Sequence, residues 1–543
     1  MMRPSTLVLI VSVWIATIGN FALWRHLTLL PELHNLRGLG FGLVFCVIVA
    51  SGTCAVLTLF NWRWLVKPVL MFYLVAAAIG VYYMLDFGVV LDVSMMTNVV
   101  QTNPGEARDL LGWRFWATLL ILGLLPAFWV WRQALTRPRL ARRALVNLAM
   151  LVGSIALLAG AILLVFQDFS SMMRNHTQLR YEINPLNSLY SLGVIAAKPY
   201  RRDTKVLLPL GDDAQLGASY ARQDKPPLLL LVLGETARAA NFGVDGYARP
   251  TTPNLSQLDA AGKIASQRNA WSCGTNTAAS LPCMFSHLGR ADFDDRKANH
   301  ENLLDVLRHA GLAVLWIDNQ SGCKGVCDRV ARATTSDLKD PGLCAGGECF
   351  DAIMLKNLEQ RIAALPPERV AKGVVIVMHQ MGSHGPAYYK RSPAEFKKFT
   401  PECTSNALQD CSQDLIVNAY DNTILYTDHF LFSAQKELDA LVQRFSGAMI
   451  YVSDHGESLG ENNLYLHGLP WRVAPDDQKH VPWITWLSPQ FEARSGASME
   501  CLRARIDEKI SHDNYFHSVL GLMDVRTSVY RPELDLFRPC VSE

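Results

Sequence analysis

The run Leu228-Leu-Leu-Leu-Val-Leu233, followed at once by Gly234-Glu235-Thr-Ala-Arg238, decides how the second half of this chain folds. A continuous apolar run of this length is typical of a strand buried on both faces of a parallel sheet. Three similar runs follow at 313–317, 373–378 and 448–452, and helical patterns lie between them. We therefore predict an α/β domain with a mainly parallel central sheet.

Polar and ionisable residues follow each of these four runs. They are Glu235 after the first, Lys324 after the second, His384 after the third, and Asp454, His455 and His467 after the fourth. Ligands of such sheets bind beyond the carboxyl ends of the strands. A single acidic residue there is usually a helix cap, and a single histidine is usually a satisfied surface or core group. Because four strands converge, we expect a functional site at this edge.

A second informative stretch is Trp271-Ser-Cys-Gly-Thr-Asn-Thr277-Ala-Ala-Ser-Leu-Pro-Cys283, which places a hydroxyl-rich turn between two cysteines. A helix start offers free backbone N–H groups that suit a phosphate or a developing anion. A bond between Cys273 and Cys283 would hold the turn still. The alternative is a disulfide-braced surface loop with ordinary helix caps.

The chemistry of these residues favours a zinc-assisted nucleophile. Glu235, Asp454 and His455 offer two carboxylates and an imidazole, a set suited to zinc with one position left open. Thr277 in that position would have its hydroxyl pKa lowered by the metal. Three further residues can neutralise phosphoryl charge or protonate a leaving alkoxide, and the sequence does not divide these roles among them: Lys324, His384 and His467.

The first third of the chain has the composition of a membrane domain. The 543 residues are 50% hydrophobic with a net charge of only +2, which argues against nucleic acid as a partner and for a membrane protein with a soluble part. Five stretches are long enough to span a bilayer, and buried helices of a large soluble protein are the alternative. The spans are Thr6–Trp24, Leu39–Phe60, Pro68–Leu85, Phe115–Trp131 and Leu145–Phe166.

Charges and cysteines predict the same orientation. Lys and Arg gather before the first span and in the loops at 61–67 and 132–143, so these ends are expected in the cytoplasm and the chain after Phe166 outside it. All cysteines except Cys46 and Cys54 lie after Phe166, an arrangement that fits an oxidising compartment better than a zinc ribbon. Most are close in sequence: 273/283, 323/327, 344/349 and 403/411, with 501 and 540 left over.

We predict three segments: a five-helix transmembrane domain at 1–167, an interfacial bridging segment at 168–218 and a periplasmic catalytic domain at 219–543. Amphipathic helices at the membrane surface suit the bridge, and a solvated linker is the alternative. The polar loop between the third and fourth spans is long enough to be functional, and a solvated loop with a helix cap is its alternative.

Four motifs surround the predicted site: Gly234-Glu235-Thr-Ala-Arg238, Cys273-Gly-Thr-Asn-Thr277, His379-Gln-Met-Gly-Ser-His384 and Ser453-Asp454-His455-Gly456-Glu457. Together with the five spans, they resemble the phosphoethanolamine transferases of Gram-negative envelopes, in the alkaline phosphatase and sulfatase superfamily. The resemblance covers essentially the whole chain. It points to the branch that modifies lipid A, which includes the colistin-resistance enzymes.

The resemblance implies transfer of phosphoethanolamine from phosphatidylethanolamine to a lipid A phosphate through a covalent intermediate on Thr277, with resistance to cationic peptides such as polymyxin as the consequence. Zinc would be held by Glu235, Thr277, Asp454 and His455. Lys324, His384 and His467 match family positions that contact substrate phosphate or a second zinc, and membrane-loop positions implicated in lipid binding are matched by Asn98, Thr102 and Glu106. The close cysteine pairs match family disulfides, and Cys501 with Cys540 is inferred as the remaining pair.

Two other functions compete with this one. The same architecture could act on lipopolysaccharide core sugars or another envelope acceptor, and a non-catalytic binding protein could keep the fold. The second would be expected to lack metal ligands, whereas all four are present here. A sulfatase is disfavoured because Thr277 cannot be converted to formylglycine.

Overall fold

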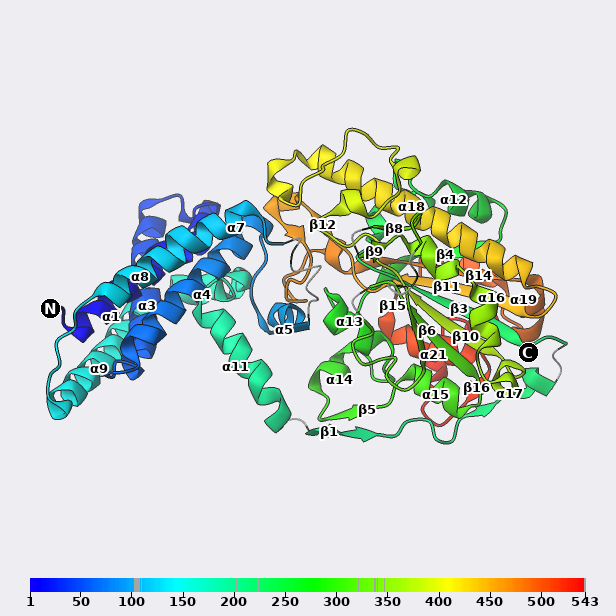
Figure 1. Ribbon diagram of the computed structural model, residues 1–543, viewed down its shortest axis with the longest axis horizontal. Coiled ribbons are helices and arrows are strands. Elements are labelled where there is room, and N and C mark those ends of the chain that lie inside the picture. The colour runs from blue at the N-terminus through cyan, green and yellow to red at the C-terminus, as the bar shows by residue number, and fades with distance from the viewer. Residues whose placement is uncertain are drawn as a thin grey trace. The chain divides into compact units, whose positions relative to one another are not determined.

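The computed structural model describes residues 1–101, 108, 110–201, 203–221, 224–320, 322–335, 338, 340–345 and 347–541. The chain divides into two compact units, one built mainly from Met1–Thr97 and the residues up to Ala196, the other mainly from Ala197–Glu543. The predicted segment boundaries at residues 167 and 218 stay predictions. Figure 1 labels the helices and strands of both units.

Among its described residues, the first unit contains five helices long and apolar enough to cross a membrane, and this confirms the five predicted spans. The first joins α1 (Pro4–Thr17) to α2 (Phe21–Leu27), and the fourth runs from α7 (Trp113–Thr118) through a π-helical turn at Leu119–Leu124 into α8 (Leu125–Arg132). Pro126 has no N–H to donate to the preceding turn, which accounts for the wider turn there. The others are α3 (Leu36–Leu59), α4 (Val66–Phe87) and α9 (Leu140–Leu164).

Buried asparagines tie the segment after the last span back to the helices. Asn184 lies between α10 (Phe166–Asn175) and α11 (Leu186–Arg201). Its side-chain amide donates to the carbonyls of Gly19 at 2.8 Å and Ala77 at 2.7 Å. The Asn20 amide donates in turn to the Asn184 carbonyl at 2.7 Å. These bonds give the buried amide N–H groups of both asparagines acceptors that water does not supply there.

The second unit is built on an eight-stranded sheet with the order β15-β4-β14-β11-β3-β10-β6-β7 (Figure 1). Strands β11, β3, β10, β6 and β7 are parallel neighbours, whereas β14 runs antiparallel to both β11 and β4. The predicted mainly parallel sheet is confirmed. The strands are β3 (Pro227–Gly234), β4 (Ile264–Trp271), β6 (Ala313–Asp318), β7 (Ala331–Thr334), β10 (Val374–His379), β11 (Ser446–Ser453), β14 (His480–Leu487) and β15 (Ile510–Ser511).

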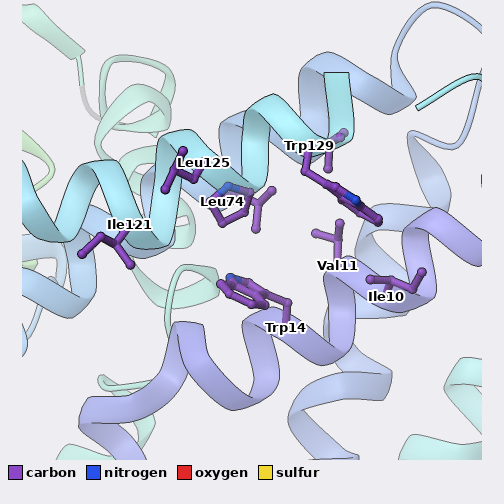
Figure 2. A pocket seen from close by; sticks show the side chains of 9 residues that line it. Ile10, Val11, Trp14, Leu74, Ile121, Leu125 and Trp129 are labelled. Atoms are coloured by element: carbon purple, nitrogen blue, oxygen red, sulfur yellow. The ribbon is translucent and has the colours of Figure 1, made fainter. Parts of the chain in front are cut away.

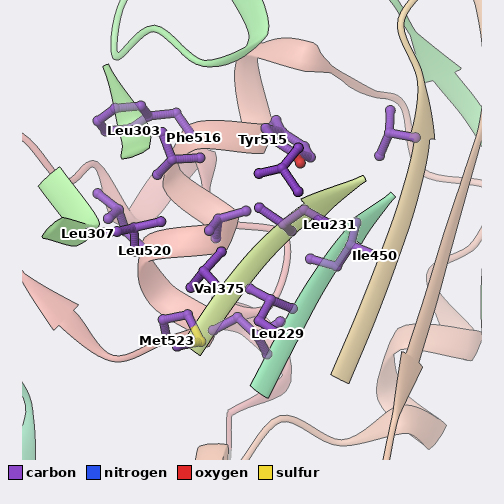
Figure 3. Close-up of a cluster of buried hydrophobic side chains, with 14 of the residues drawn as sticks. Leu229, Leu231, Leu303, Leu307, Val375, Ile450, Tyr515, Phe516, Leu520 and Met523 are labelled. Atoms are coloured by element: carbon purple, nitrogen blue, oxygen red, sulfur yellow. The ribbon is translucent and has the colours of Figure 1, made fainter. Parts of the chain in front are cut away.

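Helices cover both faces of this sheet, which explains why its strands read as unbroken apolar runs. On one face, Leu229 and Leu231 of β3 pack with side chains of α15 (Leu303–His309) and α21 (Tyr515–Leu522), as Figure 3 shows. The alternate residues Leu228 and Leu230 are equally buried. The long helix α18 (Gln413–Ala440) packs against β11.

Five disulfides lie in the second unit. They join Cys273 to Cys283, Cys323 to Cys327, Cys344 to Cys349, Cys403 to Cys411 and Cys501 to Cys540. Cys46 and Cys54 both lie in α3 of the first unit.

Candidate active site

The four predicted zinc ligands lie together at the carboxyl edge of the sheet. Glu235 follows β3, Asp454 and His455 follow β11, and Thr277 is the first residue of α13 (Thr277–Met284). The Thr277 hydroxyl donates to Glu235, with Oγ1 3.0 Å from Oε1 and 3.2 Å from Oε2. His455 Nε2 lies 3.4 Å from Thr277 Oγ1 and 3.4 Å from Asp454 Oδ2. All four side chains are buried.

This set fits a metal ion by its geometry and its unsatisfied atoms. Ligand atoms of Glu235, Asp454 and His455 lie within 4.8 Å of one another. Asp454 Oδ2 is buried and has no hydrogen-bond partner in the described chain. His455 Nδ1 donates to the Gly456 carbonyl at 2.9 Å, which leaves Nε2 as the nitrogen that faces the carboxylates. Burial, with the nearby charge of Glu235, raises the pKa of Asp454 to about 6. A cation at this point would compensate both carboxylates.

The loop that carries Thr277 is fixed from several sides. Asn276 caps α13 by accepting a hydrogen bond from the Ala279 N–H at 3.0 Å. The Cys273 N–H donates to His512 Nδ1 at 3.0 Å, and His512 Nε2 donates to the Ser453 carbonyl at 3.0 Å. Burial lowers the pKa of His512 to about 3, so the ring is a neutral brace between this loop and the end of β11.

Thr236, next to Glu235, has a left-handed backbone with φ of 60°. This conformation is strained for a β-branched residue and persists only where surrounding contacts hold it. Its N–H donates to Asp454 Oδ1 at 3.1 Å, its hydroxyl donates to Glu235 Oε1 at 2.8 Å, and its carbonyl accepts from the Tyr420 hydroxyl at 2.7 Å. Thr236 therefore links the carboxylates of two predicted metal ligands.

A close approach of two loops depends on Gly382. Its φ is 53°, and a Cβ atom there would lie 2.7 Å from the Glu235 carbonyl oxygen. Asp351 holds this loop, since its carboxylate accepts from the N–H groups of Met381 at 2.8 Å and Gly382 at 3.0 Å. This loop also carries His384.

The structure places two of the three predicted phosphate-contacting residues beside the ligand set. The His467 ring centroid lies 4.2 Å from that of His455 and 5.9 Å from that of His384. His467 Nδ1 lies 3.1 Å from Glu457 Oε2, and burial raises the pKa of Glu457 well above its ordinary value. Lys324 is half-buried on the disulfide-closed loop that follows β6.

Of the three predicted lipid-binding residues, the structure describes one, and it groups with the second unit. Asn98 lies in α5 (Val93–Gln101), while Thr102 and Glu106 lie outside the described residues. Their role in lipid binding stays a prediction.

Asp318 and His379 end two of these strands, and the sequence analysis assigned them no role; in the structure they support Glu235. His379 Nδ1 donates to Asp318 Oδ1 at 3.1 Å, and its Nε2 lies 3.6 Å from Glu235 Oε2. Burial lowers the pKa of His379, but the hydrogen bond to Asp318 and the nearby Glu235 outweigh this and raise it to about 10. Both are the last residues of their strands and are partners in register, so the strand-end rule places them at the edge of the site, while their contact with Glu235 is visible only in the structure.

Replacing His379 by glutamine is expected to weaken zinc binding about 10- to 100-fold, because a ligand that loses its orienting partner binds metal less well. Competition with a chromophoric zinc chelator measures this affinity. His480→Gln is the matched control, since the His480 ring contacts the Arg268 carbonyl outside the site. Equal zinc affinity in H379Q and the parent protein would show that the buried imidazole only fills space.

Comparisons with known proteins agree with this geometry. A family model described as Sulfatase matches residues 227–525, and one described as Phosphoethanolamine transferase EptA/EptB matches residues 49–200. The chain is 38% identical to Phosphoethanolamine transferase EptA of Salmonella typhimurium, over 98% of this chain and 96% of the relative. It is 35% identical to Phosphatidylethanolamine transferase Mcr-1 of Escherichia coli, over 96% and 95%.

Among solved structures, the integral membrane protein lipooligosaccharide phosphoethanolamine transferase A (EptA) from Neisseria meningitidis superposes with a TM-score of 0.92. The sequences are 33% identical, and the match covers 99% of each chain. Both units of the present chain are therefore shared with a solved relative.

Proposed function

Because the chain belongs to the phosphoethanolamine transferase family, we propose that it moves phosphoethanolamine from phosphatidylethanolamine to a phosphate of lipid A through a covalent intermediate on Thr277. The observation that supports this most directly is the Thr277 hydroxyl at a helix start, 3.0 Å from Glu235 Oε1 inside a buried set of metal-ligand side chains. The names of the relatives support phosphoethanolamine as the group that is transferred. The lipid A phosphate as acceptor is part of the proposal.

Glu235, Thr277, Asp454 and His455 would hold zinc, which when bound lowers the pKa of the Thr277 hydroxyl. Thr277 Oγ1 then forms a bond to phosphorus while the bond from phosphorus to the diacylglycerol oxygen breaks. Glu235 Oε1 accepts the hydrogen bond of this hydroxyl and orients it while the proton passes to water. The departing diacylglycerol oxygen takes up a proton from His384, because burial lowers the pKa of the neighbouring His467 well below its ordinary value and keeps that ring neutral.

The second half-reaction reverses these roles. A phosphate oxygen of lipid A forms a bond to the same phosphorus, the bond to Thr277 Oγ1 breaks, and Thr277 regains a proton. Lys324 would neutralise phosphoryl charge during both steps. The proposal includes a second zinc near His384 and His467. It also includes contacts of lipid with Asn98, Thr102 and Glu106.

Expression in a Gram-negative host is expected to add the mass of one phosphoethanolamine group to lipid A, because the proposed acceptor is a lipid A phosphate. Mass spectrometry of the isolated lipid A measures this, with cells that express Thr277→Ala as control. The added amine would mask negative charge, so cells should also survive higher polymyxin concentrations. An increment found on the core oligosaccharide and not on lipid A would instead select the alternative acceptor.

A further inference from the structure

The first unit contains an apolar cavity of about 410 Å³, within the usual range for ligand pockets. Figure 2 shows side chains of α1 and α8 on two sides of it. Val11, Leu74 and Val130 in its lining are buried, whereas Ile121, Leu125 and Trp129 are exposed and would face lipid. The lining is Ile10, Val11, Trp14, Leu74, Ile121, Leu125, Pro126, Trp129 and Val130.

Three helices place this cavity at the same depth in the membrane. Arg3, Lys67 and Arg132 mark the basic, cytoplasmic ends of the first, third and fourth spans. A helix rises about 1.5 Å per residue, so each lining residue can be placed by its distance from the cytoplasmic end of its helix. This distance is about 9–15 Å for the lining of α1, about 12 Å for Leu74 of α4 and about 3–17 Å for the lining of the fourth span. Half of a bilayer core is about 15 Å thick. The cavity therefore runs through the cytoplasmic half of the membrane.

Cations lie at the cytoplasmic end of the cavity. Lys67 Nζ donates to the Trp131 carbonyl at 2.6 Å, so its ammonium lies beside Arg132. Trp131 is two residues along the helix from Trp129, which lines the cavity. The start of the first span is held beside the end of the fourth span, because the Met2 N–H donates to the Ala134 carbonyl at 2.8 Å. This end thus combines an apolar slot with positive charge.

We propose that the cavity binds one acyl chain of an anionic phospholipid from the cytoplasmic leaflet, with the lipid phosphate at Lys67 and Arg132. The apolar lining matches a hydrocarbon chain, and the charge at the mouth matches an anionic head group. The lipid fills the gap between α1 and α8 next to the π-helical turn. The site is separate from the proposed transfer reaction, whose lipid substrates are expected in the outer leaflet.

Tryptophan quenching in nanodiscs tests the position of the chain. Full-length protein is placed in phosphatidylethanolamine with a small equal fraction of phosphatidylglycerol, and either lipid carries bromine on its acyl chains. Brominated phosphatidylglycerol is expected to quench more than brominated phosphatidylethanolamine, and this excess should vanish in W14F/W129F but persist in the control W116F. Equal quenching by the two lipids, or an excess that survives in W14F/W129F, overturns the proposal.

Native mass spectrometry with added phosphatidylglycerol tests the affinity and does not depend on activity. Each of Lys67→Gln and Arg132→Gln is expected to weaken binding of the retained lipid about fivefold, as loss of one interfacial cation predicts, and Arg142→Gln should not. Leu125→Phe should also reduce retention by filling the slot, whereas the neighbouring lipid-facing Leu124→Phe should not. Retention that is the same in all variants means annular lipid only, and overturns the proposal.

Discussion

Thr277→Ala is expected to lower phosphoethanolamine transfer by at least on the order of 10⁴-fold, since it removes the proposed nucleophile and one of four metal ligands. Peptide mass spectrometry is the direct measurement. Zinc-loaded parent protein incubated with phosphatidylethanolamine and no acceptor should carry a phosphoethanolamine adduct on Thr277 and release diacylglycerol. T277A should do neither.

The matched control is Thr275→Ala in the same loop. The Thr275 hydroxyl is also buried, but it donates to the Leu469 carbonyl at 2.6 Å. T275A is expected to keep the adduct, and Thr277→Ser to recover part of the activity because it restores a hydroxyl. Diacylglycerol release by the parent protein without an adduct would contradict the covalent route and favour direct attack by water or acceptor. If neither product forms, the proposed donor is wrong.

Removal of zinc by a chelator is expected to stop transfer and to lower the thermal stability of the periplasmic unit. Without a cation, the buried carboxylates of Glu235 and Asp454 oppose each other, and Asp454 Oδ2 accepts no hydrogen bond in the described chain. A metal whose free concentration is about 1,000 times its Kd adds about 4 kcal/mol to the free energy of unfolding. The measurements are metal content by mass spectrometry, the melting temperature and the rate of diacylglycerol release.

Zinc added back should restore all three, whereas magnesium should not, because it prefers six oxygen ligands in octahedral geometry. Asp454→Asn should lose zinc and transfer, and added zinc should not restore them. Full transfer by protein with far less than one zinc per chain would contradict the proposed ligand role of these side chains.

Much of the architecture could be predicted from the sequence because long apolar runs carry it. Long apolar runs indicate membrane spans or buried parallel strands, so five spans and four strands could be recognised. Parallel strands end at one edge of the sheet, and this rule predicted that Glu235, Asp454 and His455 lie together. The helical pattern between the second and third apolar runs, at 349–364, does not form a single helix. A 3-10 turn at Asp351–Leu355 and α16 (Leu358–Ala363) are separated by Asn357, whose φ is 57°.

Residues that support the site from a distance in sequence were harder to find. His512 accepts a hydrogen bond from the Cys273 N–H, although the two residues are more than 200 positions apart in the sequence. A single histidine also shows no periodic pattern. Thr236 reads as an ordinary residue after a strand, and its strained backbone becomes visible only in three dimensions. Asp351 looks like a helix cap, although it binds the loop that carries His384. Such contacts depend on the packed fold and not on local spacing.

The disulfide between Cys273 and Cys283 has a consequence for how the enzyme is made. The bond spans the loop that presents Thr277, and it forms only after the second unit has been exported. A nascent chain that is still in the cytosol carries two thiols at this point, and the loop with Thr277 is not yet closed. Under the proposed mechanism, activity would therefore depend on export. A chain that stays in the cytosol, or is inserted with the wrong topology, would not consume phosphatidylethanolamine.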